Sequence, residues 1–176
     1  AMAPVAKNFR MLIPGNGDPI PPAFNTEMRV LYSDDALYLG ITMYDPHPDS
    51  ILTQLTERDV YNENTDYILV GINPFNDGLN DFNFAVTAAG TQADSRTTSN
   101  GDDPSLNSIW YSAVKLTDFG WVCEIEIPYI SLRFPENGNQ DWGINMIRSI
   151  RRNRTQYSWN FIDRESGYSA EFQAGV

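Results

Sequence analysis

The segment Gly120-Trp-Val-Cys-Glu-Ile-Glu-Ile-Pro-Tyr-Ile-Ser-Leu-Arg-Phe134 sets the pattern for the whole chain. Its apolar and polar side chains alternate: Trp121, Cys123, Ile125 and Ile127 fall on one side, and Val122, Glu124 and Glu126 on the other. This period of two predicts a β-strand with one buried and one wet face. Pro128 has no amide hydrogen to donate, so we expect the ladder to stop there. Residues 129–134 then predict a tight helical or turn-like corner.

Similar β-rich runs recur along the chain, and no segment predicts a helix longer than about two turns. We expect strands at 28–33, 36–44, 52–57, 66–73, 82–88, 109–116, 120–127, 142–150 and 155–162. Segment 66–73 is apolar on both faces, as a central strand would be, whereas 4–25 and 94–108 are interpreted as irregular. About nine or ten short strands with turns between them predict an all-β fold, an antiparallel, jelly-roll-like β-sandwich.

Length and composition favour one domain. The chain has 176 residues, of which 41% are hydrophobic, which is enough for a single core. We expect Ala1-Met2-Ala3 to be left over from cloning and residues 4–176 to form the domain. No run approaches the roughly 18 apolar residues of a membrane helix, so we expect no direct membrane insertion by this domain.

The charge and the rarity of two residue types limit the possible functions. A formal charge of −11 disfavours nucleic acid and anionic membranes, but not neutral ligands or cations. One cysteine, Cys123, and one histidine, His47, cannot supply most zinc sites or a Ser-His-Asp or Cys-His system. His47 lies between two prolines, so no haem is expected. We expect no enzyme, although a glycosidase, which needs only two carboxylates, stays an alternative among 23 acidic residues.

Two acidic segments offer oxygen ligands for calcium. In the turn 73–81, Asn73, Asp77 and Asp81 carry hard oxygen donors of the kind that calcium prefers. Asp59, Glu63 and Asp66 form a second acidic group. The alternative is that both are ordinary polar turns.

Aromatic side chains are a second set of candidate ligand-binding residues, because sugars stack their C–H faces on rings. We expect Trp121 in the core, and Trp110 and Trp142 in the core or at its edge. Tyr61 and Tyr168 lie in polar, loop-like stretches, which makes them the candidates for stacking. We expect the arginine cluster at 148–154 to pair with the domain's own carboxylates, with an anion site as the alternative.

Several segments, taken in order, resemble the family 9 carbohydrate-binding modules. They are Arg29-Val-Leu-Tyr-Ser-Asp-Asp-Ala-Leu-Tyr-Leu-Gly40, Gly120-Trp-Val-Cys-Glu-Ile-Glu-Ile-Pro128, Leu132-Arg-Phe134, and Trp142-Gly-Ile-Asn145 followed by Arg148. The likeness is greatest to the family-9-like domain near the start of bacterial exported proteins that end in an outer-membrane β-barrel. It runs from about residue 8 to the end of the chain.

The resemblance implies a non-catalytic β-sandwich that binds a glycan or a glycan end, within a larger envelope or secreted protein linked to polysaccharide catabolism. It implies a periplasmic, outer-membrane-associated or extracellular location, calcium as a structural ion, and the parent's C-terminal barrel as a partner. The family's two clamp tryptophans fall near Glu63, where Tyr61 is the nearest ring, and near Tyr168, so tyrosines replace them; Arg58 and Asp66 flank the first ring. The family's polar sugar ligands align with apolar residues here: Leu69, Ala85 and Ile147. The alternative is therefore a structural or partner-docking domain of an outer-membrane protein whose sugar site has decayed.

Overall fold

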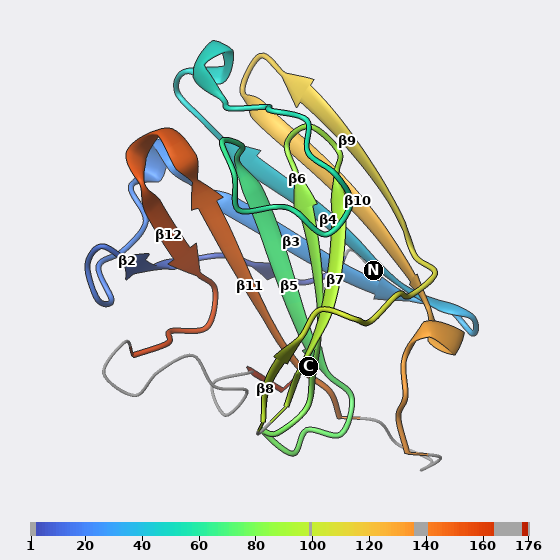
Figure 1. Ribbon diagram of the computed structural model, residues 1–176. Helices are drawn as coiled ribbons and strands as arrows, with labels where there is room; N and C mark the ends of the chain where they lie inside the picture. Colours follow the sequence, from blue (N-terminus) through green and yellow to red (C-terminus); the bar gives the residue numbers. More distant parts are fainter. Residues whose placement is uncertain (1–2, 99, 136–140, 164–173, 176) are drawn as a thin grey trace.

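The computed structural model describes residues 3–98, 100–135, 141–163 and 174–175. In these residues two antiparallel sheets pack face to face as a β-sandwich (Figure 1). The strands are β1 (Val5–Ala6), β2 (Arg10–Ile13), β3 (Thr26–Tyr32), β4 (Ala36–Tyr44), β5 (Tyr67–Asn73), β6 (Asp81–Thr87), β7 (Gln92–Thr98), β8 (Gly101–Asp103), β9 (Tyr111–Thr117), β10 (Gly120–Pro128), β11 (Gly143–Ile150), β12 (Thr155–Ser158) and β13 (Ala174–Gly175). The helical segments are single 3-10 turns: η1 (Pro22–Phe24), η2 (Pro48–Ser50), η3 (Tyr129–Ser131) and η4 (Arg151–Asn153). None of the described helices has the length and apolar character needed to cross a membrane.

The first sheet has the strand order β1-β3-β4-β10-β9, and the second has the order β2-β12-β11-β5-β6-β7-β8, with β13 paired to β11. The chain changes sheet several times, so neighbours in space are often distant in sequence. The predicted two-residue link between β3 and β4 is confirmed, because the Ser33 amide donates to the Ala36 carbonyl across Asp34 and Asp35. The predicted antiparallel sandwich is also confirmed, with more strands than expected because β1, β2, β8 and β13 are very short.

The predicted alternation of β10 is confirmed in the core. Its four inward side chains, Trp121, Cys123, Ile125 and Ile127, are all at most 2% exposed. Burial raises the pKa of the Cys123 thiol to about 12, with a smaller contribution from the charge of Glu124, so the thiol stays protonated. Gly120 begins the strand at a φ of 142°, and a Cβ there would collide with the Met43 carbonyl.

Three predictions about the elements were wrong. Residues 4–25, interpreted as irregular, contain the short strands β1 and β2. Residues 52–57 form no strand: Thr53 makes an isolated bridge to Thr65, the Leu52 carbonyl accepts the Asp66 amide, and the Thr56 carbonyl accepts the Thr91 hydroxyl. Residues 94–108, interpreted as loop, contain most of β7 and all of β8. The strand β7 has no apolar alternation; its pairing with β6 and its side-chain hydrogen bonds hold it in place.

The outer face of the second sheet is the surface on which the candidate site lies. Ile68 and Val70 of β5 are 0% exposed and point into the core. Because successive side chains of a strand point to opposite faces, Tyr67 and Leu69 point outward. Figure 1 shows the segment after η2 crossing in front of this sheet near β6 and β7.

Candidate functional site on the outer face of the second sheet

A row of apolar side chains crosses the outer face. Leu69 of β5 lies directly opposite Ile147 of β11 on one side and Ala85 of β6 on the other, and Ala93 of β7 continues the row. Residues directly opposite each other in a ladder share one face. The three positions at which the family resemblance places its polar sugar ligands are therefore neighbours here, although all three are apolar.

A polar strip lies beside this row, one step along the strands. Asn83 Nδ2 donates to Thr97 Oγ1 at 2.8 Å and to Ser95 Oγ at 3.4 Å. Both hydroxyls donate to Asp102 Oδ1 at 3.0 Å. The sequence analysis does not single out Ser95, Thr97 and Asp102, because they fall in the segment 94–108 that is interpreted as a loop. Asn83 falls in a predicted strand but is not assigned to a site. The period of two in β6, which sets Asn83 apart from Phe82 and Phe84, was the one available clue.

Tyr61 reaches across the outer face from the segment between η2 and β5. Its ring packs edge-to-face on Tyr67, with 4.9 Å between ring centroids. Burial, and secondarily the charge of Asp102, raises the pKa of the Tyr61 hydroxyl. Tyr61 therefore lies over the outer face beside the apolar row, at Tyr67. The Tyr67 hydroxyl in turn accepts a hydrogen bond from Gln156 Nε2 at 2.8 Å.

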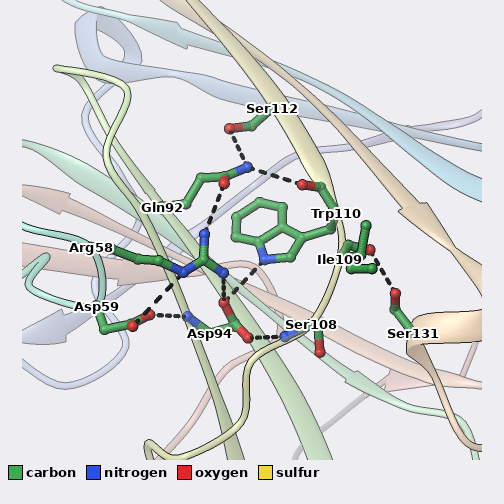
Figure 2. Close-up of polar contacts among 9 residues, drawn as sticks. All are labelled: Arg58, Asp59, Gln92, Asp94, Ser108, Ile109, Trp110, Ser112 and Ser131. Carbon is green, nitrogen blue, oxygen red and sulfur yellow. Dashed lines mark hydrogen bonds and ion pairs between the residues drawn. The ribbon is translucent and has the colours of Figure 1, made fainter.

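Arg58 does not join Tyr61 on this face. Its guanidinium donates to Asp94 Oδ1 at 2.5 Å and to Gln92 Oε1 at 3.1 Å, and its Nε lies 3.8 Å from Asp59 Oδ2 (Figure 2). Gln92 and Asp94 are opposite Val86 and Phe84, which are core residues, so they point to the inner face of β7. The structure therefore places Arg58 by the inner-face residues of β7 and Tyr61 on the outer face of the sheet, at β5.

The network around Asp94 closes the edge of the sandwich. Asp94 is 2% exposed and also accepts the Ser108 amide at 2.7 Å and Trp110 Nε1–H at 3.2 Å (Figure 2). Asp59 supplies the missing strand partner, because its amide donates to the Gln92 carbonyl and its carboxylate accepts the Asp94 amide. These contacts cover an edge that would otherwise expose unpaired backbone groups.

Asp66, expected to flank the first ring, is instead buried at 0% exposure. Its Oδ1 accepts the Arg151 amide at 2.9 Å. Burial raises the pKa of the Asp66 carboxyl to about 6, against the lowering effects of that hydrogen bond and of Arg148 and Arg152, while Asp45 raises it further. A sugar on the outer face cannot contact this carboxylate.

Two arginines of the cluster at 148–154, Arg148 and Arg152, have structural roles. Arg148 is 0% exposed and donates to the carbonyls of Phe24, Asn25 and Tyr44 and to the Thr26 hydroxyl. Arg152 pairs with the buried Asp45 at 2.6 Å, as predicted for this cluster. Burial lowers the pKa of Arg148 to about 10, although Asp66 and Asp45 act in the opposite direction, so it stays charged at neutral pH.

We predict a pH-dependent stability that originates in Asp66. Its pKa is about 6 in the folded chain, against an ordinary 3.8, so the folded chain binds more protons between these values. The contribution of Asp66 to the free energy of unfolding is therefore most favourable below pH 4. It falls by roughly 3 kcal/mol as the pH rises through 6. Asp66→Asn should remove this fall, as measured by urea unfolding from pH 4 to 7. Parallel pH profiles of the two proteins would contradict the assignment.

The turn 73–81 is ordered by its own side chains. Asp77 Oδ1 accepts the Leu79 amide at 2.8 Å and the Asn80 amide at 3.2 Å, and Asn73 Nδ2 donates to it at 3.2 Å. Partial burial opposes ionisation, but these hydrogen bonds outweigh it and lower the pKa of Asp77. Asp81, unlike the exposed Asp77, is buried, at 4% exposure. Within the described ranges the structure gathers no group of three His, Cys, Asp or Glu side chains, so Asp59, Glu63 and Asp66 do not converge.

Calcium at this turn stays a prediction, and melting curves test it. If Asn73, Asp77 and Asp81 bind calcium, an ion concentration 100-fold above Kd should stabilise the fold by about 2.7 kcal/mol. The melting temperature in calcium should then exceed that in chelator, and Asp77→Ala should remove the difference. Identical curves would leave an ordinary polar turn.

Tyr168, the expected second ring of the clamp, lies outside the described residues. Trp121 and Trp110 are buried at 0% and 4% exposure, as predicted. Trp142 packs against Tyr129 and Phe134 at the edge of the core.

Comparisons with known proteins bear on the fold. No protein-family model and no curated protein sequence matches the chain. The structure is similar to a family 9 carbohydrate-binding module from Caldicellulosiruptor kristjanssonii, solved in complex with cellotriose. The TM-score is 0.65 at 15% identity, covering 99% of this chain and 81% of that chain. A second match, from Bacteroides uniformis, is described as a candidate carbohydrate-binding protein; its TM-score is 0.63 at 13% identity, covering 89% of this chain and 78% of that chain. This chain therefore has the fold of a family 9 carbohydrate-binding module.

Proposed function

We propose that this domain is a non-catalytic carbohydrate-binding module whose site is the outer face of the second sheet. The observation that carries the proposal is the placement of Tyr61, which lies beside the apolar row and packs edge-to-face on Tyr67. A ring beside an apolar floor suits the C–H face of a sugar. Asn83, Ser95, Thr97 and Asp102 would bond its hydroxyls.

The fold supports the same proposal, because the similar module from Caldicellulosiruptor kristjanssonii was solved with cellotriose. We propose a glycan or glycan end as the ligand, and a parent protein of the bacterial envelope or a secreted protein that takes part in polysaccharide catabolism. The parent's outer-membrane β-barrel is the proposed intramolecular partner. A periplasmic, outer-membrane-associated or extracellular location follows from that proposal.

One observation favours a second function. Ile147, Leu69 and Ala85 carry no hydrogen-bonding side chain where the family resemblance expects sugar ligands. A partner-docking domain of an outer-membrane protein with a decayed sugar site would need no such ligands.

Calorimetry with Tyr61 variants separates the two functions. Loss of one stacking ring removes about 1–3 kcal/mol of apolar burial, so Tyr61→Ala should weaken binding of cello-oligosaccharides or related neutral glycans roughly tenfold to hundredfold. Tyr61→Phe keeps the ring and serves as the matched control, with a much smaller loss. Equal glycan affinity of the Tyr61→Ala variant would contradict the proposed site. No binding to a broad glycan panel by the unmodified domain would favour the docking domain.

A further inference from the structure

We infer that the outer face of the first sheet is a second binding platform, for an extended, neutral β-linked glycan. A row of side chains crosses four strands on this face. Glu126 of β10 lies directly opposite Tyr38 of β4 and Tyr111 of β9, and Tyr38 lies opposite Leu31 of β3. Directly opposite residues share a face, and Glu126 alternates with the buried Ile125 and Ile127, so the row points outward.

The row is well exposed for its residue types. Leu31 and Tyr111 are each 58% exposed, and Tyr38 is 37% exposed. Large exposed apolar groups that gather in one place mark interaction surfaces, whereas single ones need no explanation. The row therefore points to a ligand that covers it.

The neighbouring row is low at two positions, Gly40 and Ala113, which lie on either side of Glu124. Gly40 of β4, Glu124 of β10 and Ala113 of β9 lie side by side, with Arg29 of β3 opposite Gly40. A Cβ placed at Gly40 would meet nothing within 4 Å, so the space above it is open. A chain laid across the strands could rest on Gly40 and Ala113 while its edge meets the two tyrosine rings.

The spacing and the polar groups select a glycan as the occupant. One strand separates Tyr38 from Tyr111, which sets their backbones about 10 Å apart. This separation suits an extended β-linked chain, in which alternate sugar residues present the same face. Glu124 and Glu126 can accept hydrogen bonds from its hydroxyls, and Arg29 can donate to them.

Charge argues against the other occupants. The chain carries a net charge of −11, and in the two rows the glutamates Glu124 and Glu126 outnumber the one cation, Arg29. Nucleic acid and anionic lipid would be repelled by this net charge, as would a second copy of the same chain. A neutral, hydroxyl-rich chain meets no such repulsion, and two platforms on opposite sheets would raise retention on an insoluble polysaccharide by avidity.

The test uses the intact domain and variants at each face. Retention on insoluble cellulose and calorimetry with β-1,4-linked hexasaccharides of glucose, mannose and xylose are the readouts. Tyr38→Ala/Tyr111→Ala should lower retention on cellulose at least tenfold and reduce the calorimetric stoichiometry by one glycan per domain. Its melting temperature should be unchanged. Tyr32→Ala is the matched control: Tyr32 is 82% exposed but lies opposite Leu37, outside the row, so the variant should bind normally. The single variant Tyr111→Ala should show the same direction of change if the double variant folds poorly.

The outcomes separate this platform from the proposed site on the second sheet. A Tyr61→Ala variant should still bind through the first sheet, and complete loss of binding in that variant would overturn the inference. Unchanged retention and stoichiometry in Tyr38→Ala/Tyr111→Ala would also overturn it. So would sedimentation showing that the unmodified domain self-associates and that this double variant is monomeric, because the face would then bind a second copy.

Discussion

Ile125→Asp is expected to unfold the domain. Ile125 is 2% exposed in the middle of β10, with Leu39 and Ser112 opposite it on the two neighbouring strands. A carboxylate there would be buried without a partner, at a cost of several kcal/mol. That cost is comparable to the whole stability of a typical domain, about 5–15 kcal/mol. Circular dichroism melting should show no cooperative transition.

Val122→Asp is the matched control in the same strand. Val122 lies on the opposite face and directly opposite Lys115, so an aspartate there faces water and a cation. Its melting temperature should stay close to that of the unmodified domain. A soluble Ile125→Asp variant that melts cooperatively would show that the inner face of β10 is misassigned.

Asp94→Ala is expected to cost about 3 kcal/mol, because it removes the one carboxylate that joins three segments. The buried Trp110 Nε1–H and the Ser108 amide would both lose their acceptor, and Arg58 would lose its ion-pair partner. Urea unfolding measures the loss.

Two variants define the origin of that loss. Asp94→Asn keeps one acceptor oxygen and should cost less than Asp94→Ala. Arg58→Ala should cost at most about 1 kcal/mol, since the Arg58 side chain is 42% exposed and water can replace it. Equal losses for Arg58→Ala and Asp94→Ala would mean that the ion pair, and not the buried hydrogen bonds, stabilises this edge.

The sequence predicts the fold well where alternation is strong. The strands β4 and β10 were placed from their apolar period, and both lie at the centre of the first sheet. Most of β7 falls in the segment 94–108, which is interpreted as a loop because Asp94 to Thr98 carry polar side chains on both faces. Its outward residues hydrogen-bond to β6 and β8, and its inward Asp94 binds Trp110 and Arg58. Such long-range partners leave no local pattern.

The candidate site was predicted only in part. Asp66 was expected beside a ring because it is near Tyr61 in sequence, yet it shares the inner face of β5 with Ile68 and Val70. The period of two already indicated that face, and an acidic residue on it required a buried partner. For Arg58 no such rule existed, because a loop residue has no fixed face. The family resemblance assigns Leu69, Ala85 and Ile147 to one site. The register makes these three residues neighbours on the outer face.

A nuclear magnetic resonance titration of the labelled domain with cellotriose and longer neutral β-glycans tests the central claim most directly. Binding at the outer face of the second sheet should shift the amide signals of Tyr61, Leu69, Ala85 and Ile147, and the Tyr61→Ala variant should need a roughly tenfold to hundredfold higher glycan concentration for the same shifts. Amide shifts absent from these residues at every glycan tested, or confined to the edge around Arg58 and Asp94, would contradict the account.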